Sequence, residues 1–171
     1  MHWFWINRRF FLKELIPISK YKNKKVIIDE IKFDSRDESL YYLLLKQQKE
    51  NGLIKDFILQ PKYELLPKFE YFGQKRRAMT YTPDFNVIHL DDSMTAVDVK
   101  SMGTATQQGE LRRKLFEYRY PDIELIWVCR NLKHGDKEGW ILYEDLKKIY
   151  RDNKKKKKWK REPLIRFPKE E

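Results

Sequence analysis

The order of apolar and polar positions predicts strands and helices over most of this 171-residue chain. Residues 24–33 are rich in β-branched side chains and predict a hairpin that turns near Asp29-Glu30. Apolar residues at helical spacing follow Ser35, and Gly52 is a natural stop, so we expect a helix between them. Short strands are predicted at 57–59 and 63–66. The polar and basic stretch 67–79 is typical of an exposed loop.

The second half of the chain shows the same mixture of patterns. Strands are predicted at about 80–89 and 94–100, joined by a turn at 91–93. A helix from Gln107 to Tyr120 should end at Pro121, and the nearly all-apolar run Ile123 to Cys129 predicts a strand covered on both faces. A last helix is expected from Tyr143 to about Asp152. Together these elements predict an α/β (α+β) fold with a mixed sheet flanked by helices.

Composition narrows the class of protein. Aromatic residues make up 15% of the chain, which excludes a wholly disordered chain because disorder goes with few aromatics. The only cysteine, Cys129, cannot form an internal disulfide or a cysteine-based zinc site. No apolar run approaches the roughly 18 residues of a membrane span. We therefore expect a cytoplasmic protein without a membrane partner.

The net charge of +11 is concentrated near the C-terminus. Residues 147–161 hold ten basic side chains against Asp152 alone, whereas residues 1–146 are nearly neutral. Such a run suits a polyanion, because neutralised phosphates release counterions, although it could also serve only as a solubilising tail. The residues of the tail expected to bind DNA are Lys154, Lys155, Lys156, Lys157, Lys158, Trp159 and Lys160.

Four residues in three short segments carry the candidate chemistry: Glu38, Asp84, Asp98 and Lys100. Asp98 and Lys100 share a strand face because they are two positions apart. A turn near residues 91–92 would bring Asp84 close to opposite Asp98. Carboxylates on core strands are costly to bury unpaired, and a divalent cation would remove that cost. Hard oxygen ligands select Mg²⁺, with Mn²⁺ as a substitute.

Simpler interpretations exist for several of these residues. Glu38 stands three residues after Ser35, where it could merely close a capping box. Asp98 and Lys100 could be a surface ion pair worth about 1 kcal/mol or less. The consecutive cations Arg112, Arg113 and Lys114 are predicted to contact DNA phosphates, but at most one or two can face the site and the rest would be solvated.

Two sequence segments resemble the PD-(D/E)xK nuclease superfamily. They are Tyr81-Thr82-Pro83-Asp84-Phe85 and Asp98-Val99-Lys100-Ser101, preceded by a helix that carries Glu38. The chain is similar to small phage proteins with this signature and to phage Holliday-junction resolvases of the endonuclease I type. The resemblance covers residues 21–150 and leaves an N-terminal aromatic and basic arm, 1–20, and a basic tail, 151–171, outside the predicted nuclease domain.

The resemblance implies a restriction-endonuclease-like fold in which Asp84, Asp98 and Glu38 bind Mg²⁺ and Lys100 acts on the nucleophile. Asp98 stands where many members carry glutamate. The implied function is a metal-dependent endodeoxyribonuclease for branched DNA, acting as a homodimer in phage recombination or replication within the host cytoplasm. Two alternatives remain open: a structure-unspecific nickase or restriction-like nuclease, and a non-catalytic DNA-binding accessory protein of recombination.

Overall fold

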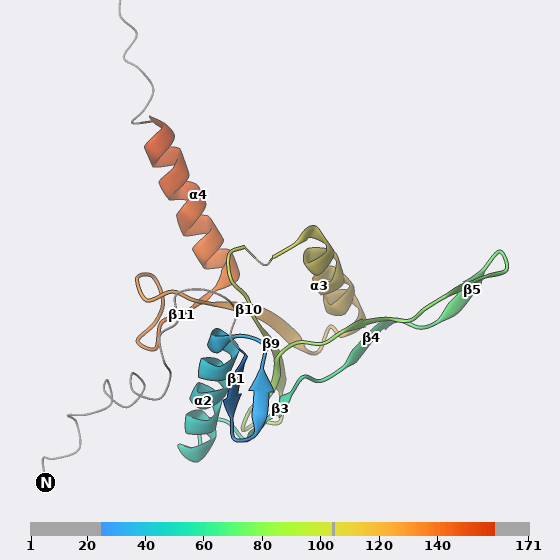
Figure 1. Ribbon diagram of the computed structural model, residues 1–171, viewed down its shortest axis with the longest axis horizontal. Helices are drawn as coiled ribbons and strands as arrows, with labels where there is room; N and C mark the ends of the chain where they lie inside the picture. Colours follow the sequence, from blue (N-terminus) through green and yellow to red (C-terminus); the bar gives the residue numbers. More distant parts are fainter. Residues whose placement is uncertain (1–24, 104, 160–171) are drawn as a thin grey trace, which may run out of the picture. The chain divides into compact units, whose positions relative to one another are not determined.

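The computed structural model describes residues 25–103 and 105–159, except for the side chains of 156–159. The chain divides into two compact units between Ser39 and Leu40, and each unit is described by itself. The first unit contains β1 (Val26–Ile28), β2 (Ile31–Phe33) and the first residues of α2 (Arg36–Glu50). All other elements belong to the second unit (Figure 1).

The first unit confirms the predicted hairpin and capping box. Asp29 and Glu30 form the turn with positive φ angles of 50° and 64°, the conformation of a type I′ turn. At the start of α2, the Glu38 backbone N–H donates to Ser35 Oγ at 3.1 Å, and the Ser35 hydroxyl donates to Glu38 Oε1 at 2.9 Å. The first bond satisfies a backbone donor at the helix N-terminus that otherwise lacks a partner, and the second fixes the Glu38 carboxylate at the cap.

The second unit is built on a five-stranded mixed sheet. Its further elements are β3 (Asp56–Leu59), β4 (Tyr63–Leu66), β5 (Phe69–Tyr71), β6 (Gln74–Arg76), β7 (Met79–Tyr81), β8 (Phe85–Ile88), β9 (Met94–Val99), α3 (Gln107–Arg119), β10 (Glu124–Arg130), β11 (Trp140–Leu142) and α4 (Tyr143–Trp159). The strand order is β11-β10-β9-β8-β3. Only β9 and β10 pair in parallel, and the other neighbours are antiparallel. The predicted α+β class is confirmed.

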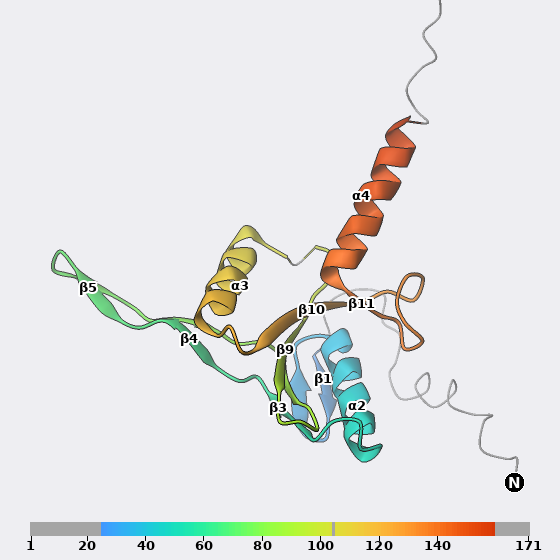
Figure 2. The ribbon, with the colours of Figure 1, turned by 180° about the vertical axis from the view of Figure 1, so that it is seen from behind.

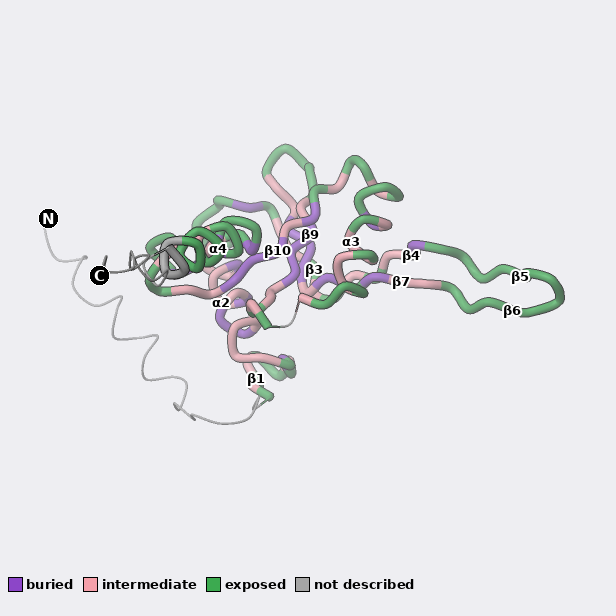
Figure 3. Tube along the Cα trace, turned by 90° about the horizontal axis from the view of Figure 1, so that it is seen from above, coloured by how far each residue is buried: buried purple, intermediate pink, exposed green. Residues whose placement is uncertain are grey.

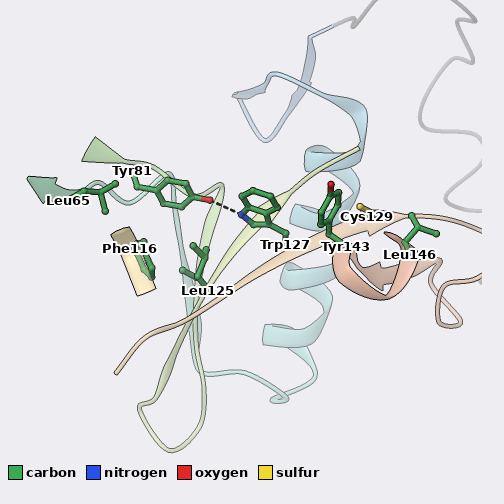
Figure 4. Close-up of a cluster of buried hydrophobic side chains, with 9 residues drawn as sticks. Leu65, Tyr81, Phe116, Leu125, Trp127, Cys129, Tyr143 and Leu146 are labelled. Atoms are coloured by element: carbon green, nitrogen blue, oxygen red, sulfur yellow. Dashed lines mark hydrogen bonds between the residues drawn. The ribbon is translucent and has the colours of Figure 1, made fainter. Parts of the chain in front are cut away.

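Helices pack on both faces of this sheet (Figures 1 and 2). On one face, Tyr41 of α2 contacts Phe85 and Trp140, with ring centroids 5.5 and 4.8 Å apart. On the other face, Phe116 of α3 and Leu146 of α4 join the main buried cluster (Figure 4). The β10 strand is thereby covered on both sides, as its apolar sequence predicts.

Two predicted boundaries are wrong for identifiable reasons. The expected strand 80–89 is two strands: β7 pairs with β4, and β8 pairs with β3 and β9. Pro83 lies in the break, where the chain lacks a backbone donor to continue a ladder. The last helix runs to Trp159 instead of about Asp152, because lysines are good helix formers and cations are favourable near a helix C-terminus.

The predicted loop at 67–79 is also wrong, although its exposure is confirmed. Strands β5 and β6 pair there as a narrow ribbon that continues the pair β4–β7 away from the sheet (Figure 3). Every residue from 66 to 78 is exposed. The short strand β11 was not predicted, and the arm 1–20 and residues 160–171 lie outside the described residues. None of the described helices has the length and apolar character needed to cross a membrane.

Candidate active site

The hairpin formed by β8 and β9 brings two predicted carboxylates together. Its register pairs Phe85 with Val97, so the next step toward the open end sets Asp84 opposite Asp98. Asp84 Oδ2 accepts a hydrogen bond of 2.7 Å from the backbone N–H of Val99, which fixes its side chain against β9. Asp84 is thus held against the residue that follows Asp98, at the end of the hairpin where the sequence predicts the two aspartates to meet.

Asp98 is buried and has a partner for each carboxylate oxygen. Its side chain is 6% exposed; Lys100 Nζ lies 2.7 Å from Oδ1, and the Tyr81 hydroxyl donates to Oδ2 at 2.5 Å. Burial, and then the charge of Asp98, raise the pKa of Tyr81, so the phenol stays protonated and remains a donor. The Asp98–Lys100 pair is therefore not the exposed surface ion pair of the simpler interpretation, and its hydrogen bonds offset the cost of burying a charge.

Tyr81 and Trp127 complete this network, and neither is among the site residues that the sequence predicts. Trp127 Nε1 donates to the Tyr81 hydroxyl at 2.9 Å (Figure 4). The parallel register pairs Trp127 with Asp98, and Lys100 Nζ lies 5.7 Å from the centre of the Trp127 ring. Trp127 thus supports both the tyrosine and the lysine that contact Asp98.

A pocket of about 630 Å³ opens beside Asp98. Three cations line it, namely Arg77, Lys100 and Arg112. Among the described residues Asp98 is its only carboxylate, and Asp84 does not line it. The Nε atom of Arg112 is buried and has no hydrogen-bond partner among the described residues. The lining charge therefore favours an anion, and the buried Arg112 donor would gain a partner from one.

The three consecutive cations of α3 differ in their surroundings. Arg113 donates to Glu117 at 2.9 Å and also to Glu144, and its guanidinium lies 5.0 Å from the centre of the Trp127 ring. Lys114 is exposed and does not line the pocket. Only Arg112 reaches it, which confirms that at most one or two of these cations face the site.

The remaining candidate residues belong to other parts of the chain. Glu38 belongs to the first unit, where its carboxylate closes the capping box, and its membership of an acidic cluster stays a prediction. Lys154 and Lys155 are exposed on α4. The side chains of Lys156, Lys157, Lys158 and Trp159, and all of Lys160, lie outside the described residues.

The donor set at the open end of the β8–β9 hairpin fits a hard divalent cation. No group of three or more His, Cys, Asp or Glu suited to a metal occurs among residues 25–103 and 105–159. Mg²⁺ does not need such a cage, because it is usually bound through one or two carboxylates together with water and substrate phosphates. Asp98 provides one carboxylate in the pocket that suits phosphate, and Asp84 provides a second against the next residue of β9.

These features define an α+β protein in which Asp98 of β9, Asp84 just before β8 and Lys100 just after β9 gather at the open end of one hairpin of a mixed sheet. Residues 18–136 match the model of a family described as "Protein of unknown function (DUF1064)". The match spans more than half of the chain, so the chain belongs to this family. It includes Asp84, Asp98, Lys100 and the β5–β6 ribbon, and ends before β11. No curated protein and no solved structure matches the chain.

Proposed function

We propose that the protein is a Mg²⁺-dependent endodeoxyribonuclease that hydrolyses phosphodiesters in branched DNA during phage recombination or replication. The observation that carries this proposal is the position of Asp84 opposite Asp98, with Lys100 Nζ 2.7 Å from Asp98 Oδ1. The resemblance to PD-(D/E)xK nucleases supports the same reaction, and its extension to branched DNA rests on that resemblance alone.

The residues of the site have distinct roles in this reaction. Asp84 and Asp98 would hold the metal ion, and a bound Mg²⁺ supplies Lewis-acid chemistry that activates water and offsets charge at the phosphate. The Lys100 ammonium, held by Asp98, would donate a hydrogen bond to the attacking water or the phosphate oxygens. Tyr81 fixes the Asp98 carboxylate from the other side, so the carboxylate cannot turn freely.

The pocket supports a phosphodiester as the substrate. Arg77 and Arg112 line it together with Lys100, and these three cations outnumber the single lining carboxylate. Arg112 would donate its unpartnered Nε–H to a phosphate oxygen as a charge-assisted hydrogen bond. The exposed Lys154 and Lys155 of α4, with the lysines that follow them, would add affinity without sequence preference.

Paired incision of a branch requires two active sites, so the proposal includes a homodimer. Sedimentation equilibrium of the full chain should give twice the chain mass in the concentration range where it cuts junctions. A protein that cuts while remaining monomeric would contradict paired incision and favour the nickase alternative.

The first experiment compares cleavage of a labelled four-way junction and its matching linear duplex, with Mg²⁺, with Mn²⁺ and with EDTA. Wild type is compared with Lys100→Ala and with Lys137→Ala, which removes an exposed lysine of the β10–β11 loop. We expect metal-dependent junction cutting by wild type and Lys137→Ala, and binding without cutting by Lys100→Ala. Binding without cutting by wild type in both metals would favour the DNA-binding accessory protein instead.

A further inference from the structure

The β5–β6 ribbon ends in an aromatic residue, Phe72, whose presence the stability of the fold does not explain. Phe72 and Gly73 form the two-residue turn with positive φ angles of 47° and 75°, and Tyr71 pairs with Gln74 across it. Both positions of such a type I′ turn favour Asn or Gly. A bulky residue with positive φ is strained, because its Cβ approaches the backbone.

Burial of the Phe72 side chain does not offset this strain. This side chain is 88% exposed, and among the described residues its aromatic partner is Tyr71, whose ring centroid lies 4.6 Å away with the two rings nearly perpendicular. Tyr71 and Phe69 are themselves 57% and 49% exposed. An unburied aromatic residue at a strained position indicates a role in binding.

The arrangement of side chains along the ribbon suits a nucleic acid. Phe69 and Tyr71 lie on one face because they are two positions apart on β5, and Arg76 shares that face as the partner of Phe69. Residues 67–78 contain four cations and one carboxylate, Glu70, so their net charge is positive. The cations are Lys68, Lys75, Arg76 and Arg77. Within the described part of the chain, none of these four cations pairs with a carboxylate. Two such ribbons would repel each other, so this charge favours a polyanion over a second copy of the chain.

The ribbon is firmly held at its base and joined to the pocket. Tyr63 of β4 packs on Phe116 of α3 and on Tyr120, which follows α3, and the Tyr120 hydroxyl donates to the Glu64 carbonyl oxygen at 3.0 Å. Arg77 lines the pocket at the point where the ribbon leaves it. At a strand rise of about 3.3 Å per residue, the tip lies about 20 Å beyond this anchored base. A DNA phosphate in the pocket and bases at the tip could therefore be contacted together.

We propose that the ribbon binds DNA by stacking Phe72 and Tyr71 on the faces of unpaired or unstacked bases. This inference rests on the proposed function, since it takes DNA as the substrate, and it makes the ribbon the element that distinguishes branched from linear DNA. Bases in a continuous duplex are stacked on both sides, whereas bases at a branch point or in a single strand offer a free face. The cations of the ribbon hold the backbone beside that base.

The test uses Phe72→Asn, which removes the ring and creates the Asn-Gly pair that a type I′ turn prefers. Phe72→Trp keeps an aromatic ring, and Leu90→Asn removes a 65% exposed apolar side chain at the closed end of the β8–β9 hairpin. Affinity is measured in EDTA for a four-way junction, a flapped duplex, a single strand and a linear duplex. Hydrogen exchange of the β5 and β6 amides shows whether the ribbon is retained.

We expect Phe72→Asn to bind the junction, the flap and the single strand roughly 5- to 100-fold more weakly, with little change for the linear duplex. Phe72→Trp and Leu90→Asn should bind like wild type. The fluorescence of 2-aminopurine at the branch point should change on binding wild type and not on binding Phe72→Asn. If binding changed the 2-aminopurine fluorescence equally at the branch point and within a duplex arm, the proposed recognition of the branch would be overturned.

Other outcomes separate this proposal from the proposed function. Unchanged affinity of Phe72→Asn, with metal-dependent cutting by wild type, would overturn the role of the ribbon and leave the nuclease intact. Altered sedimentation of Phe72→Asn without a change in DNA affinity would overturn it in favour of contact with a second copy. Tight, ring-dependent binding to a junction that is never cut would support the ribbon and overturn the nuclease.

Discussion

The Asp98 network and the β5–β6 tip place their side chains in opposite ways: a charged group is buried in the first, and aromatic groups are exposed in the second. Around Asp98, a buried carboxylate has a partner for each oxygen, and the aromatic residues that support it lie in the core. At the tip, the aromatic residues are exposed, one of them at a strained φ angle. The two regions differ in compensation: hydrogen bonds offset the cost of the buried Asp98 charge, whereas no burial offsets the strain at the exposed Phe72 ring.

The largest expected effect on activity comes from the loss of metal binding at Asp98. In wild type, Mg²⁺ at one hundred times its dissociation constant should stabilise the fold by about 2.7 kcal/mol by mass action. Asp98→Asn should abolish that stabilisation and junction cutting, because the amide lacks the charge that both the metal and Lys100 require. Thermal unfolding with and without Mg²⁺ measures it, and Asp122→Asn, at an exposed aspartate after α3, is the control. If Mg²⁺ still raised the unfolding temperature of Asp98→Asn, the cation would bind at another site.

The largest expected effect on fold stability alone concerns the tryptophan beneath the site. Trp127 is 1% exposed, donates to Tyr81 and lies against the cations of Lys100 and Arg113. Trp127→Ala should lower the free energy of unfolding by about 3–5 kcal/mol, because it leaves a large cavity. Urea unfolding checks this value. A loss below about 1 kcal/mol would mean that the network does not depend on this ring.

The part of the site that lies on one hairpin could be predicted from the sequence, and the part that depends on long-range pairing could not. The turn at 91–93 and strand alternation set Asp84 opposite Asp98 across a short, local connection. The pairing of Asp98 with Trp127 crosses α3, and no local pattern specifies a parallel register across a helix. Trp127 therefore looked like an ordinary core residue.

The ribbon could not be predicted for a related reason. Two-residue hairpins are recognised by Asn-Gly or Asp-Gly between alternating apolar and polar residues, and the sequence here places Phe72 at the first turn position. Both faces of β5 and β6 are exposed, so the strands lack the alternation that a half-buried sheet imposes. Phe72 at a turn position that favours Asn or Gly therefore prevented prediction of the hairpin, and the same residue is the unusual feature of its tip.

Removing one hydroxyl tests how tightly the Asp98 network is built. Tyr81→Phe leaves Trp127 Nε1–H without its acceptor and Asp98 Oδ2 without its donor in a buried site. We expect a loss of about 1–3 kcal/mol in the free energy of unfolding, measured by urea titration near neutral pH. Cutting should become slower while DNA affinity in EDTA is retained. An equal loss of DNA affinity would show that Tyr81 acts in binding and not in positioning Asp98.

The same tyrosine predicts a difference at alkaline pH. Burial and the Asp98 charge raise the pKa of Tyr81 above its ordinary 10.0, so above pH 10 the phenol ionises in the unfolded chain before it does in the folded one. The unfolded state then binds fewer protons, and the stability that Tyr81 contributes is intact below pH 10 and falls as the pH rises. The advantage of wild type over Tyr81→Phe should shrink by about 1 kcal/mol between pH 10 and 11. A constant difference in urea unfolding over that interval would contradict it.

The smallest effect has the opposite sign and lies at the ribbon tip. Phe72→Asn replaces a strained residue by one that tolerates positive φ, so the β5–β6 pair should become more stable by about 0.5–1 kcal/mol. The ribbon is exposed and opens locally, so the gain is expected in the hydrogen-exchange protection of its amides and not in global unfolding. A variant whose ribbon is firmer and whose affinity for branched DNA is weaker would separate stability from recognition at one side chain. A ribbon that loses protection would mean that the Phe72 ring supports the turn through its contact with Tyr71, and the strain would then have a structural explanation.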